Sequence, residues 1–184
     1  KPFPVLIYPP LQCTELNGQL VLDRYLASTS INDIENSILK LEQPVTAHIE
    51  ESRIVGFDGD SNTVASVKAQ YQRVGKLTDG DPYTVNSWHT GMYPKTFYRR
   101  PIDDDVQRWS DLAFGSPRYT HFHTCGNNPG NIATAMFDAT IGFDDQLFWE
   151  ASQFIFLDQP EQQALLEHYP DYPDAFGMRW DIGI

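Results

Sequence analysis

Short apolar runs separated by turn residues are the feature that most constrains how this chain can fold. The runs are rich in Val, Ile, Phe and Tyr and lie between Gly, Pro, Asn and Asp residues, which is typical of β-strands. They cover residues 3–8, 19–23, 45–50, 53–57, 83–89, 119–125, 132–143 and 146–156. Only Glu51 and Ser52 separate the third run from the fourth, which predicts a hairpin. We therefore expect a mainly β (α+β) fold with a mixed, largely antiparallel sheet or partial barrel.

Two segments have helical patterns instead, and we expect them to pack on the sheet. Residues 60–75 begin with a possible cap, Asp60, and end at Gly75, which suits a left-handed stop. Residues 159–168 follow a second possible cap, Asp158, with Pro160 in the tolerated first turn. The prolines that come next cannot continue a helix, so residues 169–184 are predicted to form an extended tail.

Length and charge limit the organisation and the partners of the chain. With 184 residues, 41% of them hydrophobic, we expect a single domain over residues 1–168 followed by the tail. The net charge of −12 argues against nucleic acid as a partner, because phosphate binding needs clustered Lys and Arg. No apolar run is long enough to span a membrane. With that charge, cations and a small-molecule substrate are the expected partners. Two cysteines make no disulfide framework, so we expect a reducing, cytoplasmic setting.

The sequence His121-Phe-His123 lies inside a predicted strand, where side chains alternate between the two faces. His121 and His123 should therefore share one face, with Cys125 beside them, while Phe122 points away into the core. Two imidazoles on one face can bind the same metal ion. The pair predicts half of a metal site.

His89 is the candidate third ligand, because it ends another predicted strand just before a loop that contains Gly and Pro. We expect His89, His121 and His123 to converge on one divalent ion, iron or zinc, with ring nitrogens about 3–4 Å apart. The alternative is that one histidine faces solvent and another donates to a backbone carbonyl. Nothing identifies a further catalytic residue.

Other residues near these strands have predicted roles of their own. Trp88, Tyr93 and Asn131 are candidate substrate-binding residues, and the aromatic ones favour a flat or apolar substrate. His48 and His168 are expected to be structural. Cys125 could be a ligand or a reactive thiolate, but a free cysteine is more often an inert buried side chain.

Several patches, taken in order, resemble the C-terminal part of the aminopeptidase T type metallopeptidases and their relative 2,5-dihydroxypyridine dioxygenase. The patches span nearly all of residues 1–157: residues 2–4, 16–23, 44–59, 87–94, 119–126 and 137–154. The resemblance is in pattern and order rather than in identities. It implies a metal enzyme.

The metal ligands of that family, carboxylates and histidines, carry over poorly residue by residue. Only His121 keeps the type of residue that the resemblance implies. Ile7 or a neighbour and Ser87 stand where the family has Glu, and its closing His-x-Asp pair falls at about Asn131 and Ala133. A two-metal peptidase site is therefore not expected. The constellation that remains consists of three neutral imidazoles.

Three functions are compatible with these observations. The first is a mononuclear metal-dependent enzyme that acts on a small, flat or apolar molecule, an oxygenase if the metal is iron. The second is a metallohydrolase of the aminopeptidase type, and the third is a catalytically inactive binding domain. The resemblance also implies an N-terminal domain that this sequence lacks, so we expect a homo-oligomer or a separate domain to cover part of the surface.

Overall fold

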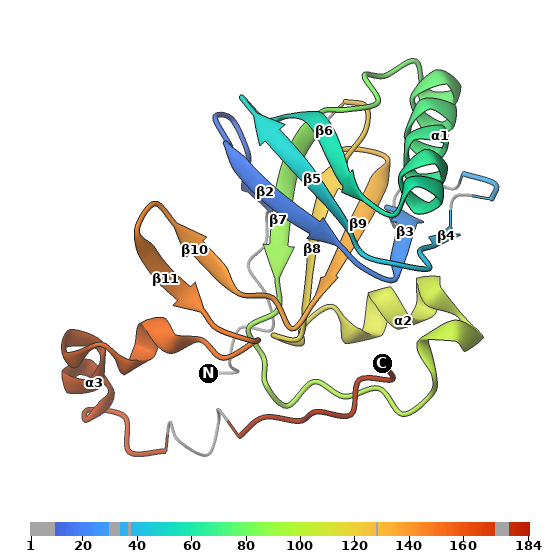
Figure 1. Ribbon diagram of the computed structural model, residues 1–184. Coiled ribbons are helices and arrows are strands. Elements are labelled where there is room, and N and C mark those ends of the chain that lie inside the picture. The colour runs from blue at the N-terminus through green and yellow to red at the C-terminus, as the bar shows by residue number, and fades with distance from the viewer. Residues whose placement is uncertain (1–9, 30–33, 37, 128, 172–176) are drawn as a thin grey trace. The chain divides into compact units, whose positions relative to one another are not determined.

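The computed structural model describes residues 10–29, 34–36, 38–127, 129–171 and 177–184, and has three α-helices among them (Figure 1). Its sheets are mostly antiparallel, which confirms the predicted mainly β (α+β) class. The helices are α1 (Ser61–Thr78), α2 (Val106–Ala113) and α3 (Pro160–Leu166). The strands are β1 (Leu11–Gln12), β2 (Gly18–Leu22), β3 (Tyr25–Ser28), β4 (Leu39–Lys40), β5 (Val45–Glu50), β6 (Arg53–Gly59), β7 (Val85–Thr90), β8 (Tyr119–Thr124), β9 (Ile132–Phe137), β10 (Ile141–Phe143) and β11 (Gln146–Trp149).

These strands form a six-stranded sheet in the order β1-β7-β8-β9-β3-β4, a three-stranded sheet β2-β5-β6 and a two-stranded sheet β10-β11. The predicted hairpin is confirmed, with Glu50 of β5 opposite Arg53 of β6. Its two turn residues, Glu51 and Ser52, both have positive φ, at 47° and 59°. That conformation follows the twist of a two-residue hairpin.

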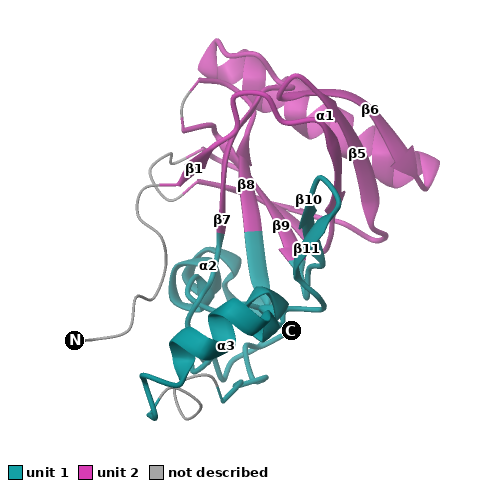
Figure 2. Cartoon of the chain, turned by 90° about the vertical axis from the view of Figure 1, so that its left-hand side faces the viewer, with its two compact units in different colours: residues 1–7, 90–120, 137–184 teal, residues 8–89, 121–136 magenta. Residues whose placement is uncertain are grey.

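The chain divides into two compact units, which are described separately (Figure 2). Unit 2 comprises residues 8–89 and 121–136, and unit 1 comprises residues 1–7, 90–120 and 137–184. The boundary between them falls within β7, β8 and β9. The prediction of one domain over residues 1–168 with a separate tail remains a prediction.

Unit 2 holds most of the six-stranded sheet, the three-stranded sheet and α1. Val67, Tyr71 and Val74 on one side of α1 are fully buried. The Tyr71 hydroxyl makes a 2.8 Å hydrogen bond with the hydroxyl of Thr124 at the end of β8. The Tyr71 ring also lies 5.9 Å from that of Phe57 on β6. The helix therefore contacts both sheets of its unit.

The ends of α1 confirm one predicted cap and correct the other. Asp60 caps the helix by accepting hydrogen bonds from the backbone N–H groups of Asn62 and Thr63. The helix does not stop at Gly75 but continues to Thr78, and Asp79 takes the left-handed conformation with φ of 51°. Gly75 is needed for space, because a Cβ there would lie 3.0 Å from the Gly80 carbonyl oxygen.

Unit 1 is centred on an aromatic cluster of Trp109, Tyr119 and Phe137, in which the first two rings lie 4.7 Å apart. Next to it, the guanidinium of Arg118 makes two hydrogen bonds of 2.6 Å to the carboxylate of Asp138. Asp138 has φ of 47° and follows the end of β9. The predicted strand over 132–143 is therefore two strands, β9 and β10.

The last part of unit 1 differs from its prediction in detail. The predicted strand over 146–156 ends at Trp149, and a 3-10 turn covers Ile155–Asp158. Helix α3 begins at Pro160, but its N-cap is Gln159, which makes no side-chain capping bond, so the prediction of Asp158 as cap is wrong.

Residues 177–184 have no regular secondary structure and run alongside residues 94–102 of the same unit. The Tyr98 N–H donates to the Asp181 carbonyl, and the Ile102 N–H donates to that of Gly183. Ile182 is fully buried, and its carbonyl accepts from the indole of Trp109. The predicted strand over 3–8 lies outside the described residues. None of the described helices is both long enough and apolar enough to cross a membrane.

Candidate metal centre

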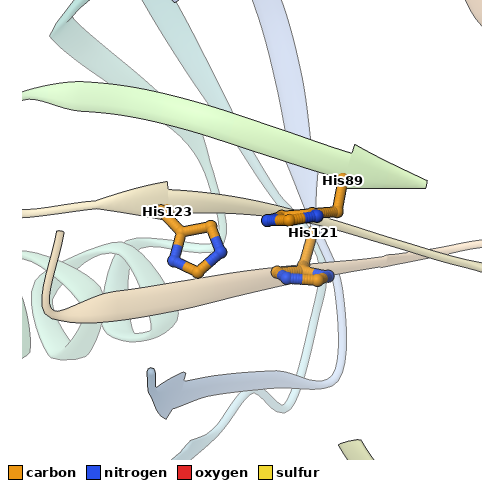
Figure 3. A group of neighbouring side chains, drawn as sticks. All are labelled: His89, His121 and His123. Atoms are coloured by element: carbon orange, nitrogen blue, oxygen red, sulfur yellow. The ribbon is translucent and has the colours of Figure 1, made fainter. Parts of the chain in front are cut away.

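Three histidines of unit 2 lie close together. His89 lies on β7, and His121 and His123 lie on its neighbour β8 (Figure 3). The rings of His89 and His121 are stacked, with centroids 4.9 Å apart and planes 11° from parallel. The His123 ring centroid is 5.0 Å from that of His89 and 5.1 Å from that of His121. Strand alternation thus puts the two β8 rings on one face, next to the third.

Each of the three rings offers a nitrogen, and the three nitrogens lie within 4.8 Å of one another. This upper limit is longer than the predicted 3–4 Å between ring nitrogens. The prediction follows from ligand distances of about 2.1 Å around one ion. Moving each nitrogen inward by about an ångström would bring the three to the spacing that one ion requires. The backbone already provides the convergence.

Burial keeps two of these imidazoles in the form that binds metal. The pKa of His121 is held well below its usual value by burial, and by the neighbouring His123 and His89. Burial and then His89 lower the pKa of His123 to about 4. Both rings are therefore neutral at pH 7, and a neutral imidazole has the free lone pair that a metal ion needs.

His123 also lacks hydrogen-bond partners for its ring. Both of its ring nitrogens are buried, and neither has a partner among the described residues. Buried polar atoms are paired in the large majority of cases, and an unpaired one suggests a missing water or ion. The residues present therefore fit a divalent metal ion.

The remaining two histidines stay apart from this group, as expected. His48 lies on β5, and its Nε2 is 2.7 Å from the Asp58 carboxylate on β6. His168 is exposed beyond the end of α3. The group of potential metal ligands found among the described residues contains neither of them.

Cys125 does not share the face of the two β8 histidines, so that prediction is wrong. β8 ends at Thr124, and Cys125 has φ of 65°, which turns its side chain. Its thiol lies 3.6 Å from the carbonyl oxygen of Tyr71 on α1. Burial raises the pKa of the thiol to about 12, which supports the inert interpretation.

The predicted register of β8 is confirmed by Phe122. Its side chain is buried, with 7% exposed, and stacks on Trp88 at 5.9 Å between ring centroids. Trp88 precedes His89 in β7, so alternation directs it to the opposite face of the sheet. The structure does not bring Trp88 together with the histidines.

The other two candidate substrate-binding residues lie in loops. The side-chain amide of Asn131 donates to the carbonyl of Cys125 at 3.2 Å, within the turn between β8 and β9. Tyr93 belongs to unit 1, where its backbone N–H donates to the Gly115 carbonyl. Substrate binding by these residues remains a prediction.

No site role was predicted for Ser87 on β7, which has the same strand phase as His89. Its side chain is fully buried, and its hydroxyl has no hydrogen-bond partner among the described residues. The spacing of two residues from His89 was the available signal.

Unit 1 contains a cavity of about 540 Å³ of its own. Its lining is mostly apolar and includes the stacked pair Trp149 and Phe154, whose ring centroids lie 4.3 Å apart. Leu166 of α3 and Trp180 of the tail also line it. The volume is in the range of small-molecule sites, which is about 300–1,000 Å³.

A search of solved structures finds that this chain is similar to 2,5-dihydroxypyridine dioxygenase from Pseudomonas putida KT2440, with a TM-score of 0.54 and 16% sequence identity. The match covers 81% of this chain and 42% of the dioxygenase chain, so the sequence spans less than half of that protein. No family model and no curated protein matches the sequence. The likeness supports the dioxygenase part of the resemblance at the level of the fold. The aminopeptidase T part remains a prediction.

Proposed function

We propose that this chain is a mononuclear metal-dependent enzyme that acts on a small molecule, with a divalent ion held by His89, His121 and His123. The observation that carries the proposal is the unpaired ring of His123 next to two other imidazoles. A structural histidine uses at least one ring nitrogen in a hydrogen bond, as His48 does with Asp58. The two β8 histidines are neutral at pH 7 and ready to bind.

The chemistry follows from the type of ligand. Three imidazoles bring no negative charge, so an ion bound there keeps its full charge for a substrate oxygen or an anionic substrate. Such an ion supplies Lewis-acid chemistry, and iron adds reactions with dioxygen. The three histidines would hold the ion in place.

Oxygen chemistry on a small aromatic substrate is the version that we favour, because the similar solved structure is a dioxygenase. A second candidate is a zinc-dependent hydrolase. Three histidines and an open position also form a known catalytic zinc site, so the ligand set favours this alternative independently of the fold.

Metal reconstitution tests the proposal. The chain should be purified in chelator and then loaded with Fe(II) without oxygen, or with Zn(II) or Co(II), and the bound metal counted after gel filtration. We expect one ion per chain, and oxygen uptake with dihydroxylated aromatic compounds only in the iron form. Hydrolysis by the zinc form would favour the second candidate. No retained metal would overturn both and leave an inactive binding domain.

We further propose that the chain forms a homo-oligomer and works in the cytoplasm. The aromatic residues, 13% of the sequence, motivate the first part, and the two unpaired cysteines motivate the second. Light scattering at micromolar concentration tests the first part, and a monomer there would contradict it. Cell fractionation tests the second.

A further inference from the structure

Buried polar side-chain atoms without partners gather at one place in unit 2. Among the described residues they are the hydroxyl oxygen of Ser87 and the two ring nitrogens of His123. Burying such a group without a hydrogen bond is unfavourable. Two unpaired groups that lie close together therefore suggest a hydrogen bond between them when the site holds its ion.

The strand register places Ser87 and His123 opposite one another. β7 and β8 are neighbours in the sheet, and their arrows point in opposite directions (Figure 3). The stacked rings put His89 opposite His121. Two residues back along β7 and two forward along β8 lead to Ser87 and His123. Side chains in such a pair share a face, with Cβ atoms about 4.5–5.5 Å apart.

The two groups are also chemically complementary. A neutral imidazole that binds a metal through one nitrogen carries a proton on the other, and this outer N–H needs an acceptor. A serine hydroxyl can accept that hydrogen bond. Nearby hydroxyl and thiol groups are already engaged, since Thr124 bonds with Tyr71 and the Ile132 carbonyl, and Cys125 faces the Tyr71 carbonyl.

We propose that Ser87 is a positioning residue for the metal centre, and that its hydroxyl accepts a hydrogen bond from the outer N–H of His123 when the inner nitrogen binds the ion. This inference rests on the proposed function. Ser87 and His123 make no direct hydrogen bond in this structure. The rotation that moves His123 toward the ion, or one bridging water, completes the contact. The hydroxyl then fixes the orientation and the tautomer of the ring.

Two measurements on Ser87→Ala test this role. Metal affinity should fall, whereas the stability of the metal-free protein should not. Co(II) affinity, measured by competition with a chelator, should fall about 10-fold or more, as outer-shell changes at histidine ligands do. Urea unfolding of the metal-free protein should be unchanged or shifted to higher urea, because an unpaired buried hydroxyl is removed. A serine needed only for packing predicts the reverse pattern: lower stability and unchanged affinity.

Thr134→Val is the matched control. Thr134 is a buried residue of β9, and its hydroxyl donates to the carbonyl of Phe122. Its loss should lower the unfolding midpoint and leave Co(II) affinity within about 3-fold of wild type. The conservative variant Ser87→Thr keeps the hydroxyl and should also keep the affinity.

NMR spectroscopy reports on the hydrogen bond itself. In the proton NMR spectrum of the Co(II) protein, the metal shifts the signal of the His123 ring N–H. That proton should exchange with water faster in Ser87→Ala than in wild type. Equal affinity and equal exchange in the two proteins would overturn the inference while leaving the metal site intact. A Ser87→Ala chain that fails to fold would overturn it as well. If wild type itself does not bind Co(II), the proposed function fails first and this inference with it.

Discussion

The histidine cluster of unit 2 and the apolar cavity of unit 1 are both candidate ligand sites, but they are built from different kinds of local structure. The histidines project from two regular strands, so their directions follow from alternation. Apart from Trp149 at the end of β11, the cavity is lined by turns, a short helix and the tail, where no simple spacing relates one residue to the next. The comparison shows why polar sites on strands can be recognised in a sequence when apolar cavities cannot.

The largest expected effect concerns the histidines. His121→Ala or His123→Ala should lower metal affinity by at least about 100-fold, more than a typical outer-shell change, because one of three ligands is lost. Metal counting after gel filtration measures this. His168→Ala should retain the metal, since His168 lies beyond α3 and outside the group. If His123→Ala retained its metal fully, the histidine cluster would not be a metal site that the cavity of unit 1 could be contrasted with.

Acid should weaken the histidine region next. Well above pH 6.5, His123 is neutral in both the folded and the unfolded chain. As the pH falls, the unfolded chain takes up a proton near 6.5, whereas burial delays uptake in the folded chain to about 4. Stability of the metal-free protein is therefore lost across this window, by up to about 3 kcal/mol from His123 alone. His121, with its pKa also lowered, adds to the loss.

Urea unfolding at pH 7 and at pH 5 measures this loss. In His123→Gln, the free energy of unfolding should depend less on pH than it does in wild type. Equal stability of the metal-free wild type at both values would contradict the burial of neutral rings.

A larger side chain in the cavity of unit 1 should weaken the binding of an apolar probe there, whereas added metal should not. Leu166→Trp places an indole at a residue that lines the cavity, and should weaken binding of a neutral aromatic probe such as naphthol about 10-fold. Leu165→Trp is the matched control, because Leu165 is 58% exposed and does not line the cavity. Tryptophan fluorescence titration measures both. Equal probe affinity in the two variants would remove the cavity as a binding place.

The smallest effect separates the two faces of β8. Phe122→Leu removes the stacking on Trp88 and should lower stability by about 1 kcal/mol. Metal affinity should stay unchanged, although Phe122 lies between two ligands in the sequence. Thermal unfolding and the Co(II) titration together check this. A loss of affinity that matched a ligand variant would mean that the faces are coupled.

The strands, and the placement of His121 and His123 on one face, could be predicted because both depend on local alternation. The position of His89 beside them depends on the pairing of β7 with β8. The hairpin over β5 and β6 followed from two residues between two apolar runs. The same rule failed at Cys125, where one residue with positive φ redirects the side chain toward α1. It also failed at Asp138, which divides one predicted strand into two. Single left-handed residues interrupt a pattern without a strong signal in the sequence.

Long-range packing could not be predicted. Gly75 suggested a helix stop, yet its role is to allow close approach of the backbone around Gly80. Trp88 neighbours His89 in the sequence, but its ring stacks on Phe122, a contact between two strands. Its role in substrate binding remains a prediction. Ser87 had the right phase, but its burial and unpaired hydroxyl become visible only when the strands are placed side by side.

The division of the chain also has a consequence for the order of folding during synthesis. The histidine-bearing unit 2 is complete in the sequence once residue 136 has been made. Unit 1 must wait much longer, because the carbonyl that pairs with the Trp109 indole belongs to Ile182. Since the ribosome releases the chain from its N-terminus onward, the strands that carry His89, His121 and His123 can associate while the partner of Trp109 is still unmade.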